Sequence, residues 1–146
     1  MTADPTPTTV DVAGGWPRVY VLFPGTARAA LAFYHRVFGG ELVVHTFEEF
    51  GRDDGPADAV AHGELRGPVT LFGADTGPGE DSARMTGMML SILGTDEARL
   101  RGWFDALADD GQVLDALTLR PWGGIDGQLL DRHGLRWLIG IEGAGA

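Results

Sequence analysis

Hydrophobic residues recur along the chain at two spacings, one typical of strands and one typical of helices. Residues 18–23 form a short β-branched and aromatic run ending at Pro24-Gly25, which predicts a strand and a turn. Residues 27–38 carry apolar positions at helical spacing, and Gly39-Gly40 ends the predicted helix because glycine accepts a positive φ. Further strands are predicted at 41–47, 59–66 and 69–73, with a charged loop at 48–58.

The same order of elements then returns. A strand is predicted at 87–93, a helix at 97–108, and strands at 112–119, 127–131 and 136–141. Thr26 and Asp96 are the predicted N-caps of the two helices and lie 70 positions apart, as do Phe33 and Trp103 within them. Gly67 and Gly134 head the last strand of each half, at a spacing of 67. The chain is therefore predicted to be a tandem βαβββ repeat.

The repeat also sets the expected domain organisation. A module at 17–75 and a module at 86–142 are joined by a linker at 76–85, and tails at 1–16 and 143–146 are expected to be disordered or frayed. Neither module could bury its sheet face alone, so we expect one α+β domain over residues 17–142. The alternative is an ordinary α+β sandwich whose halves are similar by accident.

Composition removes several classes of function. The 146 residues include no Cys and no Lys, which excludes disulfides, thiolate zinc sites, Cys nucleophiles and Schiff-base chemistry. A net charge of −10 argues against nucleic-acid binding; it suits a cationic ligand or simply keeps the protein soluble. The chain has no membrane-length apolar segment and no signal-peptide pattern, so we expect a cytoplasmic protein with no membrane contact. The absence of Lys and Asn is typical of a high-GC, bacterial genome.

Two sets of residues carry a resemblance to a known family. The helix end at 32–42, Ala-Phe-Tyr-His-Arg-Val-Phe-Gly-Gly-Glu-Leu, resembles the vicinal oxygen chelate superfamily of glyoxalases, bleomycin-resistance proteins and dioxygenases. Residues 59–65, Trp122-Gly123 and 131–137 resemble its PhnB-like branch. The resemblance implies tandem βαβββ modules that form a cupped mixed sheet, a small-molecule ligand, and a homodimer in which module exchange completes the cup.

The resemblance also implies four metal-ligand positions on the first and last strands of the modules. In this chain those positions are Val19, Leu71, Met89 and Leu138, and all four are apolar. A divalent ion needs oxygen or imidazole ligands, which Val and Leu do not offer. We therefore expect no metal and no cofactor, which weakens any prediction of metal-dependent glyoxalase or dioxygenase chemistry.

His62 and Glu64 are the candidate catalytic pair. They lie two residues apart on a predicted strand and so share a face, where Glu64 could orient His62 as a general base. The same pair could be a solvated contact with no role, or part of a relocated metal site that needs ligands from elsewhere.

The remaining candidates would bind a ligand in the cup. The predicted lining is Val19, Val21, Phe23, Leu71, Met89, Ser91, Trp122, Gln128 and Leu138. Trp122 could stack on a flat or cationic ligand, or be a core aromatic that closes a strand end. Arg120 is interpreted as a rim residue rather than a carboxylate anchor, and the acidic loop at 48–58 as either a lid or a solvated turn.

Two functions follow, and whether the protein is an enzyme stays open between them. The first is a metal-independent, PhnB-like binding protein for a small molecule, an antibiotic or a metabolite, with cationic guests favoured by the acidic charge. The second is an isomerase- or lyase-like enzyme acting on a small carbonyl metabolite, metal-dependent or with His62 as base. A third class, a structural partner module, would have a cup filled by its own side chains.

Overall fold

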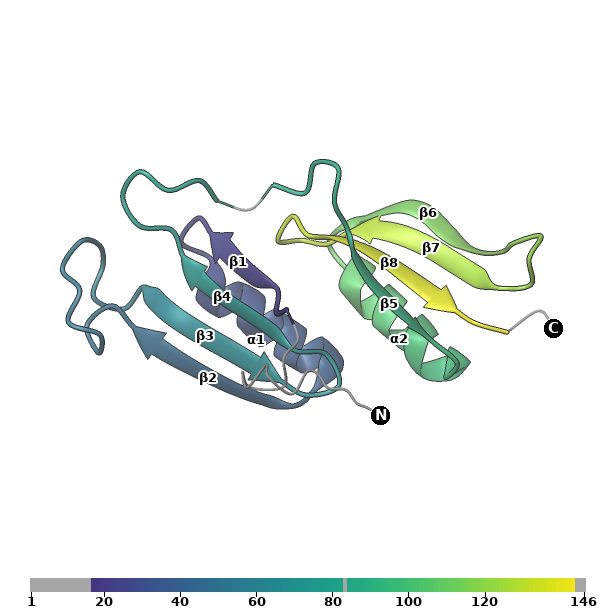
Figure 1. Ribbon diagram of the computed structural model, residues 1–146, viewed down its shortest axis with the longest axis horizontal. Helices are drawn as coiled ribbons and strands as arrows, with labels where there is room; N and C mark the ends of the chain where they lie inside the picture. The colour runs from purple at the N-terminus through teal and green to yellow at the C-terminus, as the bar shows by residue number, and fades with distance from the viewer. Residues whose placement is uncertain (1–16, 83, 144–146) are drawn as a thin grey trace, which may run out of the picture.

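The two modules repeat one order of elements in the computed structural model, which describes residues 17–82 and 84–143 (Figure 1). The first module contains β1 (Tyr20–Phe23), α1 (Ala27–Phe38), β2 (Glu41–Thr46), β3 (Val60–Arg66) and β4 (Leu71–Asp75). The second contains β5 (Leu90–Gly94), α2 (Glu97–Ala108), β6 (Gln112–Leu119), β7 (Ile125–Leu130) and β8 (Arg136–Ile141). The tail predicted at 1–16 lies outside the described residues, as do residues 144–146 of the tail predicted at 143–146. Within the described ranges, neither helix has the length and hydropathy needed to cross a membrane.

Each module folds into a four-stranded mixed sheet with one helix against it, which confirms the predicted α+β class. The strand orders are β1-β4-β3-β2 and β5-β8-β7-β6, so the two sheets have the same topology. The first strand of each module pairs in parallel with the last, and the other pairs are antiparallel. We call the face of each sheet turned away from its helix the outer face; the outer faces point toward the viewer in Figure 1.

Both helices occupy the predicted residues, 27–38 and 97–108, but only one has the predicted cap. Asp96 Oδ1 accepts a hydrogen bond from the backbone N–H of Arg99 at 3.2 Å, as expected of an N-cap. Thr26 makes no side-chain cap bond. The buried Asp75, at the end of β4, replaces it by accepting from the N–H of Ala27 at 2.9 Å. The sequence hides this cap because its donor and acceptor are 48 positions apart.

The helix of the first module packs directly on the second module. The buried Tyr34 donates its hydroxyl to Asp131 Oδ2 at 2.7 Å, and Trp137 Nε1 donates to the same oxygen at 2.8 Å. Phe38 lies 5.0 Å from Trp103 and 5.6 Å from Trp137, measured between ring centroids. These aromatic residues pack at the contact between the modules, and one apolar cluster runs through both modules.

His133 also lies at the contact between the modules. Its ring lies 5.5 Å from that of Phe33 and is half-buried between the modules. Burial lowers the pKa of His133. The uncharged imidazole therefore packs as an aromatic ring at this contact.

The 70-residue spacing of the helices does not hold for the strands. Phe23 and Gly94 are structural equivalents, because the carbonyl of each accepts from the first residue after the last strand of its module, Thr76 and Glu142. They lie 71 positions apart because β1 and α1 are joined by three residues, whereas β5 and α2 are joined by two. A shift of one residue turns a strand side chain to the opposite face.

The same kind of shift affects the last strands, because Thr76 and Glu142 lie 66 positions apart and not 67, and together the shifts correct the expected cup lining in the first module. Val21, Phe23 and Leu71 lie on the helix-facing side of the sheet and are almost fully buried. Their neighbours Tyr20, Leu22 and Phe72 take the outer face instead. In the second module, Ser91, Leu138 and Gln128 do lie on the outer face, as predicted.

Candidate functional site

A continuous chain of hydrogen bonds crosses the outer face of the first sheet. The hydroxyl of Tyr20 on β1 lies 2.8 Å from His62 Nδ1 on β3, and His62 Nε2 lies 2.8 Å from Glu64 Oε2. Arg66 Nε donates to the other oxygen of Glu64 at 2.8 Å. Phe72 on β4 lies between these strands, and its ring contacts the rings of Tyr20 and His62 edge-on. The predicted His62–Glu64 contact is therefore present, and it is part of a longer arrangement.

The partners of His62 fix how its protons are placed. Hydrogen bonds from His62 and Arg66 lower the pKa of Glu64, so this side chain is a carboxylate that only accepts. The Nε2 that faces it must then carry a proton, and a neutral His62 is left with Nδ1 as an acceptor. Burial, followed by the charges of Glu64 and Glu80, raises the pKa of Tyr20, so its hydroxyl stays protonated and donates to Nδ1.

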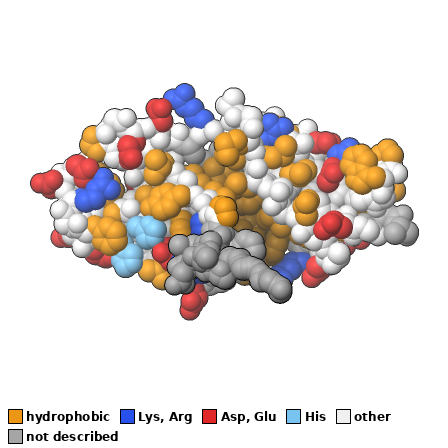
Figure 2. Space-filling model, viewed as in Figure 1, with side chains coloured by type: hydrophobic (Ala, Val, Ile, Leu, Met, Phe, Trp, Pro, Cys, Tyr) orange, Lys and Arg blue, Asp and Glu red, His pale blue; other side chains and the backbone are white. Residues whose placement is uncertain are grey.

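Two apolar grooves lie at the boundary between the modules, which we call the seam, and both are lined by residues near the starts of β1 and β5. A groove of about 260 Å³ lies there, lined by Val19, Leu71, Met89, Ser91 and Trp137 among others. A second groove of about 250 Å³ is lined by Val19, Tyr20, Leu22, Met88 and Leu90, together with part of the linker. Figure 2 shows hydrophobic side chains gathered between the two halves of this face. Val19, Met89 and Ser91 from the predicted lining thus lie around one groove, and the buried Leu71 borders it as well.

A third groove, of about 450 Å³, lies at the other end of β5, β7 and β8. Leu93, Leu138 and Ile141 are among its apolar residues, and Trp122 and Asp126 also line it. The side chain of Trp122 is 74% exposed, so its interpretation as a core aromatic is wrong. Leu138 lies in this groove and not in the seam grooves, which divides the predicted lining between two places.

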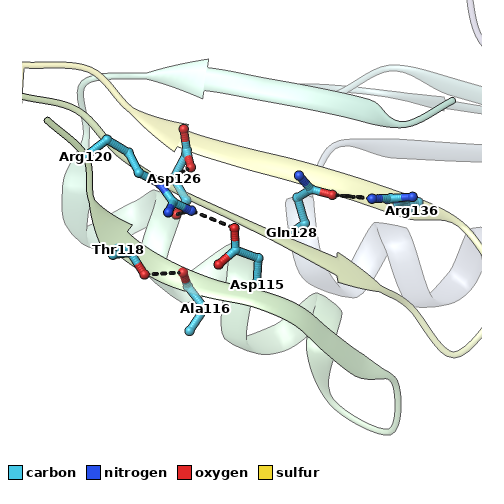
Figure 3. Close-up of polar contacts among 7 residues, drawn as sticks. All are labelled: Asp115, Ala116, Thr118, Arg120, Asp126, Gln128 and Arg136. Atoms are coloured by element: carbon cyan, nitrogen blue, oxygen red, sulfur yellow. Dashed lines mark hydrogen bonds and ion pairs between the residues drawn. The ribbon is translucent and has the colours of Figure 1, made fainter. Parts of the chain in front are cut away.

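The polar residues of the second sheet are largely bonded to one another (Figure 3). Arg120 Nε donates to Asp126 at 2.8 Å, and a terminal nitrogen of Arg120 donates to Asp115 at 2.7 Å. Gln128 Oε1 accepts from Arg136 at 2.6 Å. Arg120 therefore has two carboxylate partners within the chain, in agreement with its interpretation as a rim residue rather than a ligand anchor.

The donor set on these faces does not fit the metal implied by the resemblance. At the expected ligand positions, Leu71 is buried against the helix, while Val19, Met89 and Leu138 offer no hard donor. The register shift brings Phe72 to the outer face in place of Leu71, and it offers no hard donor either. No group of three or more His, Asp or Glu side chains in residues 17–82 and 84–143 is placed to hold an ion.

A further cavity, of about 690 Å³, lies apart from the outer faces at the start of α1. It is lined by Arg28, Ala29, Phe47 and Asp58 among others, and by none of the predicted site residues. The loop that was interpreted as a lid or a solvated turn forms one of its walls. Arg52 in this loop stacks 3.8 Å above the centroid of the buried Phe47 ring.

Tyr20 is the site residue that the sequence analysis missed. It sits 42 positions from His62 and reaches it only because β1, β4 and β3 are neighbours in the sheet. The side-chain alternation of a strand predicts that Tyr20 and Leu22 share a face, but not which strands lie beside them. Strand order was the missing information.

Comparison with known proteins agrees with this architecture. The chain is 26% identical to protein YjdN of Escherichia coli (strain K12) over 136 residues, which covers 84% of this chain and 92% of that protein. The crystal structure of protein PA1353 from Pseudomonas aeruginosa is 28% identical with a TM-score of 0.72, covering 86% of this chain and 96% of that one. The PhnB protein from Bacillus cereus, 23% identical with a TM-score of 0.73 over 86% and 98% of the two chains, shares the fold. Residues 17–139 match the family model, and the chain belongs to the Glyoxalase/Bleomycin resistance protein/Dioxygenase superfamily.

Proposed function

We propose that this protein binds a small organic molecule with an apolar body on the seam between its two modules. The observation that carries the proposal is the open groove where Val19, Met89 and Ser91 from different modules meet. Val19 is 39% exposed and Met89 41% exposed, so apolar surface faces outward here and is available to a guest. Ligand sites are typically concave and mostly apolar with a few polar groups, and Ser91 supplies a hydroxyl in this groove.

Binding in this proposal does not depend on a metal. The superfamily's ligand positions carry hydrocarbon and thioether side chains, so a guest must be held by apolar contact and by hydrogen bonds. The homodimer and the cytoplasmic location stay predictions that belong to the same proposal. The net charge of −10 favours neutral or cationic guests over anionic ones.

The neutral fluorescent probe N-phenyl-1-naphthylamine tests the proposal. Its fluorescence is expected to rise saturably with the wild-type protein, and equally after dialysis against EDTA. Val19→Asp is expected to weaken this binding at least ~10-fold, because it places a charge in the groove. Val43→Asp is the matched control, since Val43 is 50% exposed on the outer face of β2, away from the seam. Equal binding by both variants, or binding that requires added metal, would contradict the proposal.

A second candidate function, proton abstraction next to a carbonyl group, is supported by one specific observation. His62 Nε2 and the Glu64 carboxylate lie 2.8 Å apart, the arrangement that holds an imidazole in one tautomer and stabilises its protonated form. Phenylacetone in D₂O is the test substrate: wild-type protein is expected to speed exchange of its α-protons for deuterium. Exchange no faster than in buffer would reject this function and leave the binding proposal standing.

A further inference from the structure

His62 is not open to a ligand in the way a general base requires. Its Nε2 is bonded to Glu64 and its Nδ1 to the hydroxyl of Tyr20, each at 2.8 Å. A base must come within hydrogen-bond reach of the proton that it removes. A ligand could reach Nδ1 only by displacing Tyr20, whose ring also stacks on the imidazole with 5.5 Å between centroids.

Tyr20 connects this hydrogen-bonded chain to the apolar grooves. Its ring lines the groove of about 250 Å³ beside Leu22 and Met88, while its hydroxyl reaches His62. Tyr20 as a whole is 46% exposed, so part of its side chain is open to ligand atoms in the groove. The hydroxyl donates its proton to His62 and keeps lone pairs with which to accept another.

We propose that Tyr20 is the catalytic residue that exchanges protons with the ligand, and that His62 and Glu64 act through it. The inference rests on the second candidate function, proton abstraction, and changes which atom performs it. The ligand class is a carbon acid with an apolar or aromatic body, for which a ketone with a benzyl group beside its carbonyl, such as phenylacetone, is a simple example. Its body would lie against Leu22 and Met88, and its acidic carbon would face the oxygen of Tyr20.

The proton transfer balances without any added reactant. The C–H bond of the ligand breaks and its proton goes to the oxygen of Tyr20, while the electron pair stays with the ligand as an enolate. The original hydroxyl proton of Tyr20 moves to His62 Nδ1, and the imidazolium formed is stabilised by the Glu64 carboxylate at Nε2. The protons on Tyr20 and His62 exchange with the solvent, so in D₂O the reverse transfer delivers deuterium to carbon with no other net change.

We call this transfer from the ligand through Tyr20 to His62 the relay. The rate of α-deuteration of phenylacetone, followed by ¹H NMR, tests it. Tyr20→Phe removes one oxygen atom and keeps the ring, and it is expected to lose at least ~100-fold in protein-catalysed exchange. His62→Gln is expected to lose exchange to a similar extent. His45→Gln is the matched control, because His45 is paired across the strands with His62 but bonds Glu49.

The possible outcomes distinguish the proton relay from the two proposed functions, proton abstraction and small-molecule binding. Wild-type exchange that Tyr20→Phe leaves unchanged overturns the relay and keeps His62 as a direct base. No exchange by the wild type overturns both the relay and proton abstraction. The binding proposal is tested separately, by whether the wild type binds the fluorescent probe.

A measurement without substrate gives a second check. The ¹⁵N spectrum of the neutral form of His62 is expected to show a proton on Nε2 and an unprotonated Nδ1 whose shift changes in Tyr20→Phe. A proton on Nδ1 in the neutral ring overturns the relay, because Tyr20 could not then donate to that atom.

Discussion

Replacing Tyr34 with Phe tests the buried contact that joins the two modules. The substitution removes one hydroxyl, whose hydrogen bond to Asp131 Oδ2 is 2.7 Å long and shielded from water. A hydrogen bond to a charged group contributes about 1.5–3 kcal/mol to the free energy of unfolding. Asp131 keeps three donors, namely Trp137 Nε1 at 2.8 Å and the backbone N–H groups of His133 and Leu135 at 2.7 and 3.1 Å. Tyr34→Phe should therefore lower the free energy of unfolding by about 1.5–3 kcal/mol.

Equilibrium unfolding in urea, followed by tryptophan fluorescence, measures this loss. The midpoint is expected to fall with the slope unchanged, since the folded structure is retained. In thermal unfolding the same loss corresponds to roughly 6–12 °C, at about 4 °C per kcal/mol for a chain of this size. Tyr20→Phe is the internal comparison, because Tyr20 is half-exposed and its loss should cost less. A Tyr34→Phe protein within about 0.5 kcal/mol of wild type would show that this contact does not stabilise the fold.

Four further results are expected. Burial, followed by the nearby Asp131 charge, raises the pKa of Tyr34 far above its usual 10.0. The unfolding free energy of the wild type should therefore fall as the pH rises past 10, and that of Tyr34→Phe should fall less. Circular dichroism at increasing pH measures both. Trp122→Ala should leave the unfolding free energy within about 0.5 kcal/mol while weakening the binding of benzyltrimethylammonium about 2–5-fold, measured by calorimetry. Gly63→Ala should destabilise by about 1–3 kcal/mol, since its new methyl group would meet the Leu31 side chain, and an unchanged melting temperature would contradict that packing. Light scattering should give twice the chain mass of 15.5 kDa if the expected homodimer forms.

The elements were predictable because their signals are local. Residues 27–38 and 97–108 carry helical periodicity between glycine or acidic boundaries, and both helices occupy those positions. The pairing of His62 with Glu64 was also local, since two residues on one strand share a face. The tandem repeat followed from comparing these local patterns with each other.

The wrong predictions concern strand faces and neighbours, which depend on how distant segments assemble. The 70-residue spacing came from the helices, and the additional residue in the connection at Pro24–Thr26 moved the strand of the first module out of that spacing. Val21 and Phe23 were therefore expected on the wrong face. Tyr20 was missed because its partner comes from a strand two places away in the sheet. Turn length and strand order are properties of the assembled sheet, which periodicity does not report.

The bond between Tyr34 and Asp131 has a consequence for any separation of the halves. One half carries the donor and the other carries the acceptor, so each fragment made by cutting the linker at 76–85 would expose its member to water. Reassociation of the two fragments would bury this hydrogen bond again. In a dimer formed by module exchange, the same bond would have to form between the two chains. Asp131 therefore keeps this hydrogen bond only while a first module, from its own chain or from a second one, lies against it.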